Sequence, residues 1–373
     1  MTSQIKVLTT LRFFAAFHVV LFHAVVLGFL TGGPYWGRQF AAMGSTGVTC
    51  FFVLSGFILV YTYGGDNLQP GRFWQARFAR IYPAYLLVLL LTAPFFFTDP
   101  ANMPFYEWSR HHLAAASILA VTMLQAWVPR AALTWNPVCW SLSVEAFFYL
   151  LFPFILLRSK ALTRSQLLLG IVLLSAFSLL VSASFVVLHP DGAENLSTPG
   201  FTFFWRNVLF YNPLVRLPEF VIGMLTGHLF MMCRSDEKIS LPLIIGGLMV
   251  LALLTALYGK IPYPLISPGL LAPAFAAIIY GLALQPKWTG FLENRMFVVL
   301  GEASYSLYLL HALVLLDVYM AMPDLPHLPR LLLSIAATIP VALVVYFVVE
   351  RPARNRLRPL STSGAARRAQ TFS

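Results

Sequence analysis

Long runs of apolar residues recur from one end of the chain to the other, separated by short polar stretches. Each run is about 17–25 residues long, the length at which a helix crosses the ~30 Å hydrocarbon core of a bilayer. The pattern therefore predicts an all-α integral membrane protein with about ten transmembrane helices. We expect these helices, each to within a few residues, at 7–29, 44–63, 81–97, 138–157, 166–188, 214–232, 241–258, 262–284, 296–320 and 331–349.

An eleventh run, residues 113–128, is shorter and rich in alanine, and Pro129 closes it. Lys and Arg collect in cytoplasmic loops. If this run does not cross and the N-terminus is cytoplasmic, 18 of the 25 Lys and Arg residues lie inside; if it crosses, only 10 do. We therefore expect both termini in the cytoplasm and a re-entrant or interfacial helix at 113–128 on the outer side. Because irregular backbone at membrane depth needs surrounding protein or a water-filled cavity, this segment also indicates a cavity.

Composition agrees with this interpretation. Hydrophobic residues make up 59% of the 373 residues and charged residues 10%, whereas a soluble domain carries about 25% charged residues. The net charge of +11 is typical of basic cytoplasmic loops rather than of nucleic-acid binding. Residues 1–350 are expected to form one membrane domain, and the basic tail 351–373 is expected to be cytoplasmic and disordered. The three cysteines lack metal or redox spacing, and we expect no metal site.

Ionisable residues within the apolar runs are costly and are therefore candidates for function. Arg12 and His23 stand eleven positions apart on the first predicted helix, so both project from one face, about 16 Å apart along the axis. This arrangement suits a substrate that enters phosphate-first from the cytoplasm and presents its reactive end to His23. The alternative is that Arg12 anchors the helix at the interface and His23 makes a structural hydrogen bond.

A second basic group lies at the cytoplasmic side. Arg77 and Arg80 are at i and i+3 and share a helix face, and paired arginines bind phosphate groups bidentately. The alternative is an anchor for anionic lipids. On the preceding predicted helix, Ser55 is expected to line a cavity, but no base is spaced to activate it as a nucleophile.

Polar residues also mark the start of the helix 138–157, on the outer side. Ser141 and Glu145 are four apart and share a face. Glu145, near the outer boundary, would orient or charge-stabilise an imidazole, hydrogen-bond a sugar, or simply stabilise the helix start electrostatically. Trp140 suits either an interface anchor or a surface on which a carbohydrate stacks.

Two further groups are interpreted as mainly structural. Arg216 and Glu219, at i and i+3, are expected to form a buried ion pair. The predicted helix 296–320 contains polar residues that are too costly for a scaffold alone and indicate a lined cavity. Within this cluster we favour packing or cavity lining over catalysis for the histidine. The members of the cluster are Ser304, Tyr305, Ser306, Tyr308 and His311.

Taken together, these stretches resemble the acyltransferase 3 family of integral membrane O-acyltransferases over most of the chain. In one departure, Ala146 stands where the family often has a second acidic residue, which leaves Glu145 to carry that role. In another, a fused extracytoplasmic esterase-like domain is lacking, so a second-step partner would be a separate protein. The features that carry the resemblance are Arg12 and His23 with ten residues between them, FFVLSGF, the arginine pair in RFARIYPAY, WSLSVEAFFYL, SYSLYLLH and the closing ERP.

The resemblance implies transfer of an acyl group, most often acetyl from acetyl-CoA, to a hydroxyl. The acceptor would be a glycan or, in some branches, a lipid or macrolide-type compound. His23 would be the central catalytic residue, as general base or covalent relay, with Glu145, and the donor would bind at Arg12, Arg77 and Arg80. The protein would lie in the bacterial cytoplasmic membrane. The residues expected to line the cavity or contact the acceptor are Ser55, Trp140, Ser141, Ser304, Tyr305 and His311.

A transporter or flippase of glycolipids is the alternative function, because intramembrane Arg, His and Glu also mark transport paths. Two observations argue against it. The sequence has no evident internal repeat, and the arginine pair is better suited to holding phosphate. Release of free CoA from acyl-CoA would distinguish an enzyme from a transporter.

Overall fold

The expected transmembrane helices are the main elements of the fold. The computed structural model describes residues 4–30, 32–65, 68–98, 106–192, 203–233, 237–284 and 287–357. Within these ranges, nine helices are long and apolar enough to cross a membrane, and the only β-pairing is one isolated bridge. The long helices, several of which continue a shorter one, are α1 (Lys6–Val26), α3 (Gly47–Tyr63), α4 (Pro70–Thr98), α7 (Trp140–Ser159), α8 (Arg164–Leu188), α10 (Pro213–Met232), α11 (Ser240–Leu257), α14 (Ser304–Ala321) and α15 (His327–Val345).

One of the ten expected spans, 262–284, does not form a continuous helix. Ser267, at φ −129° and ψ 128°, has extended backbone, and only the part after it forms a regular helix, α12, of 13 residues. The expected span 296–320 is likewise divided into α13 and α14. The shorter helices are α2 (Tyr35–Ala42), α5 (Glu107–His111), α6 (Leu113–Val121), α9 (Phe204–Tyr211), α12 (Leu271–Ala283), α13 (Arg295–Glu302) and α16 (Arg351–Leu357).

The segment 113–128 does not cross the bundle, as its charge context predicts. Helix α6 has nine residues and is therefore about 13 Å long, less than half the hydrocarbon thickness. It lies against α4, where Tyr85 donates a hydrogen bond of 2.5 Å to the Ala120 carbonyl and Tyr82 one of 3.1 Å to the Val121 carbonyl. Irregular turns then lead to α7.

Part of the tail expected to be disordered is ordered. Residues 351–357 form α16, which packs along the first turns of α4, where Gln75 Nε2 lies 3.3 Å from the Leu357 carbonyl oxygen. The remaining tail, 358–373, lies outside the described residues, as does most of the expected external loop between α8 and α9.

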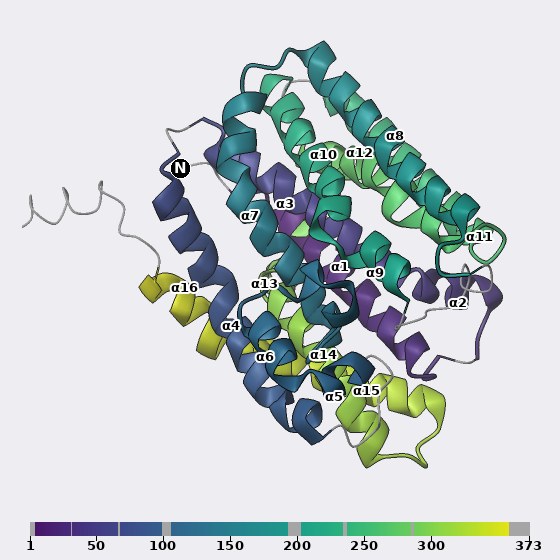
Figure 1. Cartoon of the computed structure of the whole chain (residues 1–373). Helices are drawn as coiled ribbons and strands as arrows, with labels where there is room; N and C mark the ends of the chain where they lie inside the picture. Colours follow the sequence, from purple (N-terminus) through teal and green to yellow (C-terminus); the bar gives the residue numbers. More distant parts are fainter. Residues whose placement is uncertain are drawn as a thin grey trace, which may run out of the picture.

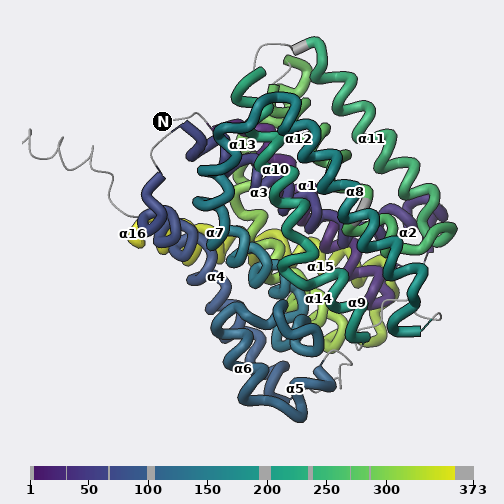
Figure 2. The backbone as a smooth tube through the Cα atoms, turned by 45° about the horizontal axis from the view of Figure 1, so that its top comes forward, coloured from purple at the N-terminus to yellow at the C-terminus, as the bar shows by residue number. Residues whose placement is uncertain are grey.

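Helices α1 and α3 run through the middle of the bundle (Figure 1), with α8, α10, α11 and α12 on one side and α4, α14 and α15 on the other. In Figure 1, α2 lies at the right, α9 right of centre and α5 near the bottom, whereas α16 lies at the left, away from all three. Figure 2 shows that α5 and α6 form an outlying lobe at the base of α4.

Small residues bring α3 and α10 into close contact. A Cβ atom on Gly56 would lie 2.1 Å from the Phe220 carbonyl oxygen, and one on Gly223 would lie 1.9 Å from the Val53 carbonyl oxygen. Only glycine permits this approach. The same holds where Gly47 faces Ala15 of α1.

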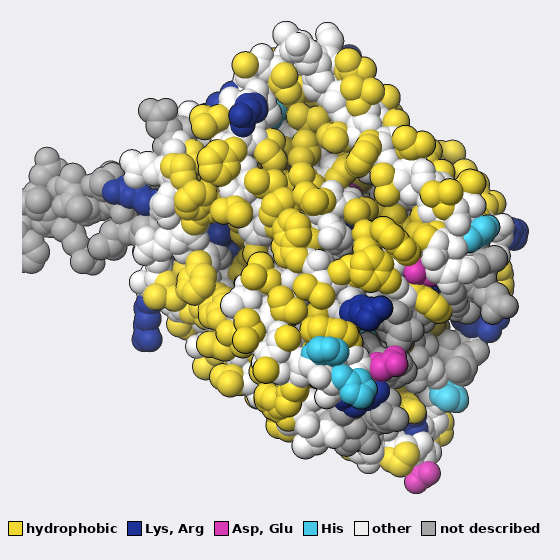
Figure 3. Space-filling model, in the orientation of Figure 1, with side chains coloured by type: hydrophobic (Ala, Val, Ile, Leu, Met, Phe, Trp, Pro, Cys, Tyr) yellow, Lys and Arg dark blue, Asp and Glu magenta, His cyan; other side chains and the backbone are white. Residues whose placement is uncertain are grey.

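The outer surface of the bundle is largely apolar. Figure 3 shows hydrophobic side chains over the flank and most charged side chains toward its margins. Leu90, Leu180 and Leu253 are among the large apolar side chains that are more than half exposed. Such a surface is stable in lipid but not in water.

Candidate active site

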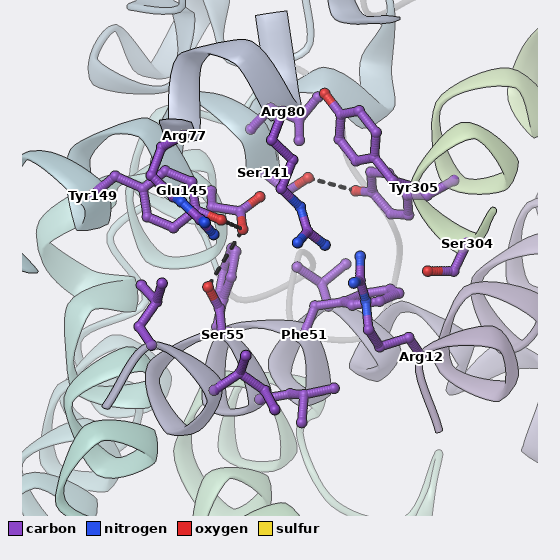
Figure 4. Close-up of a pocket in the computed structure, with 17 residues that line it drawn as sticks. Arg12, Phe51, Ser55, Arg77, Arg80, Ser141, Glu145, Tyr149, Ser304 and Tyr305 are labelled. Atoms are coloured by element: carbon purple, nitrogen blue, oxygen red, sulfur yellow. Dashed lines mark hydrogen bonds between the residues drawn. The ribbon is translucent and has the colours of Figure 1, made fainter. Parts of the chain in front are cut away.

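A charged cavity of about 90 Å³ lies among α1, α3, α4, α7 and α14. We call it the arginine cavity. Arg12 enters it from α1, Arg77 and Arg80 from α4 and Glu145 from α7, and their charged groups point toward its centre (Figure 4). The structure thus brings together the three arginines that the sequence analysis expects to bind the donor. The other polar residues of the wall are Ser55, Ser141, Tyr149, Ser304, Tyr305 and Tyr308.

The three arginines differ in how the protein holds them. Arg77 donates a hydrogen bond of 3.2 Å to Tyr63, and its guanidinium lies 5.7 Å from the ring centres of Tyr63, Phe73 and Tyr149, within cation–π range. Arg12 and Arg80, by contrast, make no hydrogen bond to any described residue. Each guanidinium carries five N–H donors, so the cavity presents unused donors to an incoming acceptor.

Negative charge in the protein offsets part of this positive charge. Glu145 and Glu350 both act electrostatically on Arg12 and Arg80. Glu350, which closes the sequence ERP, is 2% exposed and accepts a hydrogen bond of 2.8 Å from Ser306. Two carboxylates among three guanidinium groups leave the site with net positive charge, which favours a phosphate-bearing ligand.

The position of Glu145 corrects one prediction. It accepts hydrogen bonds from Ser55 (3.4 Å) and Tyr149, so it belongs to the arginine cavity and does not orient His23 as expected. The reason is the turn of α7: Ser141, Glu145 and Tyr149 recur every four residues on the face toward α3 and α4. Ser141 and Glu145 thus share a face as predicted, and Tyr149, which sequence reasoning missed, follows from the same spacing.

His23 contacts a second histidine. His23 Nδ1 lies 3.0 Å from the Val19 carbonyl oxygen and 3.0 Å from His311 Nε2, with ring centres 4.8 Å apart. His311 is fully buried, and its Nδ1 lies 2.6 Å from the Tyr308 carbonyl oxygen. His311 therefore supplies the imidazole partner, one of the roles considered for Glu145, and does more than the packing or cavity lining that the sequence favours.

These contacts assign the tautomers of two neutral imidazoles. A carbonyl oxygen only accepts, so His311 Nδ1 must carry the proton and His311 Nε2 must be an acceptor. The proton between the rings then belongs to His23 Nδ1, which leaves His23 Nε2 with a free lone pair. Among the described residues, His23 Nε2 has no hydrogen-bond partner. The pair thus presents a base or nucleophile.

Two cavities border His23. One, of about 130 Å³, has arginine, tyrosine and tryptophan side chains in its wall, and we call it the polar cavity. The other, of about 270 Å³, is mainly apolar, and we call it the apolar cavity. The residues with polar side chains around the polar cavity are Ser45, Trp140, Arg206, Tyr211, Arg216, Tyr258, Tyr263, Ser267 and Tyr308.

The arginine cavity and the polar cavity adjoin. Val48 and Tyr308 line both, and Tyr308 is fixed by hydrogen bonds to Ser141 (2.7 Å) and the Val138 carbonyl (3.0 Å). The stripe predicted for Arg12 and His23 therefore exists, but a wall of two side chains divides it into separate compartments.

The remaining predicted site residues divide between these compartments. Ser55, Ser141, Ser304 and Tyr305 line the arginine cavity. Ser304 Oγ is buried without a hydrogen-bond partner among the described residues. Trp140 lines the polar cavity, with its ring centre 4.8 Å from that of Tyr211.

The predicted Arg216–Glu219 ion pair is confirmed, with a separation of 3.0 Å and both side chains buried. Thr49 bridges the pair: its hydroxyl donates a hydrogen bond of 2.9 Å to Glu219 and accepts one of 3.1 Å from Arg216. Sequence reasoning missed that Arg216 also lines the polar cavity, since spacing alone gives no sign of that. No group of three or more potential His, Cys, Asp or Glu metal ligands occurs among the described residues.

Known proteins share this sequence pattern. The profile of the acyltransferase domain that defines the acyltransferase 3 family matches residues 5–348. Acyltransferase MdmB of Streptomyces mycarofaciens is 28% identical over 325 residues, which cover 83% of this chain and 78% of that protein. O-acetyltransferase OatA of Staphylococcus aureus is 24% identical over 371 residues, 93% of this chain and 56% of OatA. No solved structure matches the chain significantly.

Both relatives are named as acyltransferases, which favours an enzyme over the glycolipid transporter considered above. The family profile spans nearly every described helix, including those that carry the arginine cavity and the histidine pair. The chain thus belongs to the acyltransferase 3 family and is a membrane-embedded O-acyltransferase.

Proposed function

We propose that this enzyme takes an acyl group from acyl-CoA on the cytoplasmic side and transfers it to a hydroxyl of a glycan or other membrane-associated acceptor. The observation that carries the proposal is the pair of guanidinium groups, Arg12 and Arg80, that make no hydrogen bond to the described residues and lie in a cavity next to the one that His23 lines. The protein would lie in the bacterial inner membrane, with the end that bears α16 in the cytoplasm.

The donor would bind with its phosphates in the arginine cavity. Arg77, held by its aromatic neighbours, supplies a fixed positive charge, and Arg12 and Arg80 supply free N–H donors for phosphate oxygens. The pantetheine arm would then pass Val48 and Tyr308 and bring the thioester to His23. Acetyl-CoA is the donor that the family resemblance implies.

His23 Nε2 would act as the general base. It removes the proton of the acceptor hydroxyl while the hydroxyl oxygen attacks the thioester carbonyl carbon. The tetrahedral intermediate collapses as the C–S bond breaks, and the CoA thiolate takes the proton back from the imidazolium. In the covalent route the same lone pair attacks the carbonyl carbon first and the C–S bond breaks, which releases the CoA thiolate. The acceptor oxygen then takes the acyl group from the ring as the C–N bond breaks, and the hydroxyl proton passes to the thiolate.

The acceptor would occupy the polar cavity. Trp140 and Tyr211 offer aromatic faces on which a sugar ring packs, and Ser45 hydrogen-bonds to Tyr263 on the opposite wall. Aromatic rings with a few fixed polar groups are typical of sites for polar organic ligands. Arg216, 5.7 Å from the Trp140 ring centre and paired with Glu219, adds a further polar group to this side.

The experiment is CoA release by the purified protein in lipid nanodiscs, with acetyl-CoA and a membrane extract as acceptor source. His23→Ala should abolish release while CoA binding and thermal stability are retained. His18→Ala is the matched control, because His18 hydrogen-bonds to the Phe40 carbonyl (2.7 Å) and lines none of the three cavities. Normal release by His23→Ala would remove His23 from the mechanism.

A further inference from the structure

The apolar cavity is the largest of the three spaces around the site, at about 270 Å³ against about 130 and 90 Å³. His23 lines it, together with the last turns of α1 and side chains from α4 and α14. This cavity lies on the far side of His23 from Arg12. Helix α1 lines it with Phe22, His23, Val26 and Leu27, and α14 lines it with residues one to five positions past His311.

The wall of this cavity offers a guest almost no free polar group. Thr92 donates to the Val88 carbonyl at 2.8 Å, and Trp135 donates to the Leu89 carbonyl at 2.9 Å. Tyr106 donates to the Trp135 carbonyl. Asn136 donates to the Leu309 carbonyl and accepts from the Val138 amide, both at 3.3 Å. These side chains line the cavity, yet their hydrogen bonds are made within the protein, so the surfaces presented inward are mostly carbon.

A space lined mainly by carbon favours an apolar occupant. We propose that the apolar cavity binds the hydrocarbon chain of the acyl group, and that this enzyme therefore takes donors with acyl chains longer than acetyl. The inference rests on the proposed function, in which the thioester reaches His23 from the arginine cavity. A chain attached to that carbonyl extends past His23 on the side away from Arg12, which is where the apolar cavity lies.

The polar cavity is less suited to this role. Arg216 Nε there is buried without a hydrogen-bond partner among the described residues, and a hydrocarbon chain beside it would exclude the water or ligand that would otherwise pair with it. Acceptor and acyl chain thus have separate compartments whose walls share Phe22, His23 and Pro137.

The test uses thioethers of CoA, which cannot transfer an acyl group. S-ethyl, S-butyl and S-hexyl-CoA would be titrated against the full-length protein in nanodiscs by calorimetry. Burying each added methylene should tighten binding about fourfold until the cavity is filled. Leu316→Trp places a larger side chain in the cavity, so affinity should no longer increase with the length of the alkyl chain. Leu316→Ala enlarges the cavity, so affinity should go on increasing for longer chains.

Leu90→Trp is the control, since Leu90 is 64% exposed on α4 and lines none of the cavities. It should leave the chain-length series unchanged. Equal affinity of wild-type protein for all three thioethers, as expected if a lipid tail fills the cavity, would overturn the inference. The inference would also be overturned if Leu316→Trp bound the three thioethers with the same affinities as the wild type. Failure of CoA itself to bind would instead overturn the donor assignment on which the inference rests.

Discussion

Arginine inside a membrane costs at least ~2.5–3.5 kcal/mol, and this chain deals with that cost in two ways. Arg216 is neutralised by Glu219 at 3.0 Å, and Arg77 is enclosed by three aromatic rings. Arg12 and Arg80 have acidic charges nearby but no hydrogen bonds to the described residues. A scaffold would gain nothing from leaving such donors free, so they are best explained by a ligand that arrives with its own acceptors.

The histidine pair leads to a prediction about His311 as a positioning residue. His311→Leu removes one of the two acceptors of the His23 Nδ1 proton and leaves the Val19 carbonyl as the other, so the imidazole keeps its tautomer but loses the contact that holds its ring in orientation. We expect kcat for acyl transfer to fall about 10- to 100-fold, as for other residues that orient a functional group. The KM for acyl-CoA should change little, because His311 does not line the arginine cavity.

The conservative variant separates positioning from packing. In His311→Gln, an amide oxygen accepts the His23 Nδ1 proton, and part of the lost kcat should return. Steady-state kinetics of the two variants beside the wild type make the comparison. Equal loss in both, with a matching fall in thermal stability, would show that His311 only fills space.

At this scale the sequence predicts which residues matter better than it predicts their neighbours. Helical spacing correctly places Arg77 with Arg80 and Ser141 with Glu145, because each pair lies on a single helix. It does not predict that Glu145 faces the arginines, or that His311 meets His23, because those contacts join helices far apart in the chain. The positions where helices face each other depend on packing that one sequence does not reveal.

Helix boundaries follow the same logic. Nine expected spans correspond to long helices because hydrophobic length alone decides whether a helix crosses. The remaining span, 262–284, is broken at Ser267 and Pro268, because proline lacks a backbone N–H donor and disfavours helical backbone in the residue before it. The break falls at the polar cavity, which Ser267 lines, and so shapes the compartment proposed for the acceptor.

Close helix packing gives a prediction about stability. Gly56→Ala places a methyl group about 2 Å from the Phe220 carbonyl oxygen, so α3 and α10 must separate. We expect a loss of ~1–3 kcal/mol in the free energy of unfolding, measured as a lower Tm in detergent. Gly246→Ala is the matched control: it is also a helical glycine, but no atom lies within 4 Å of its added Cβ, so its Tm should stay or rise. Equal Tm values for the two variants would contradict the packing argument.

For the whole molecule, the short helix α6 fixes the orientation of everything after it. His112 and Arg130 flank the segment and are both exposed, so cysteines at these positions should react with a membrane-impermeant maleimide in intact cells. A cysteine at Ala161, exposed beyond α7, should react only after permeabilisation. The background is Cys233→Ser, because Cys50 and Cys139 are buried. Labelling of His112→Cys and Arg130→Cys from opposite sides would show that the segment crosses.

The proposed transfer of an acyl group across the membrane needs a route for the donor that is not an open channel. The wall formed by Val48 and Tyr308 meets that need, because it separates the arginine cavity from the polar cavity at His23. Val48→Trp would thicken the wall and keep the thioester from the imidazole. Since misplacement of reacting groups by about 1 Å can cost ~100-fold in rate, we expect transfer to fall by at least that factor while CoA still binds at the arginines.

Retained CoA binding shows that Val48→Trp has folded, so the loss of transfer cannot be assigned to unfolding. Val172→Trp makes the same substitution at a position that is 62% exposed on α8 and should leave both binding and transfer unchanged. If Val48→Trp transferred acyl groups normally, the donor arm would have to reach His23 by another path. The two compartments would then be unrelated, and the arginines would no longer identify where the acyl group enters.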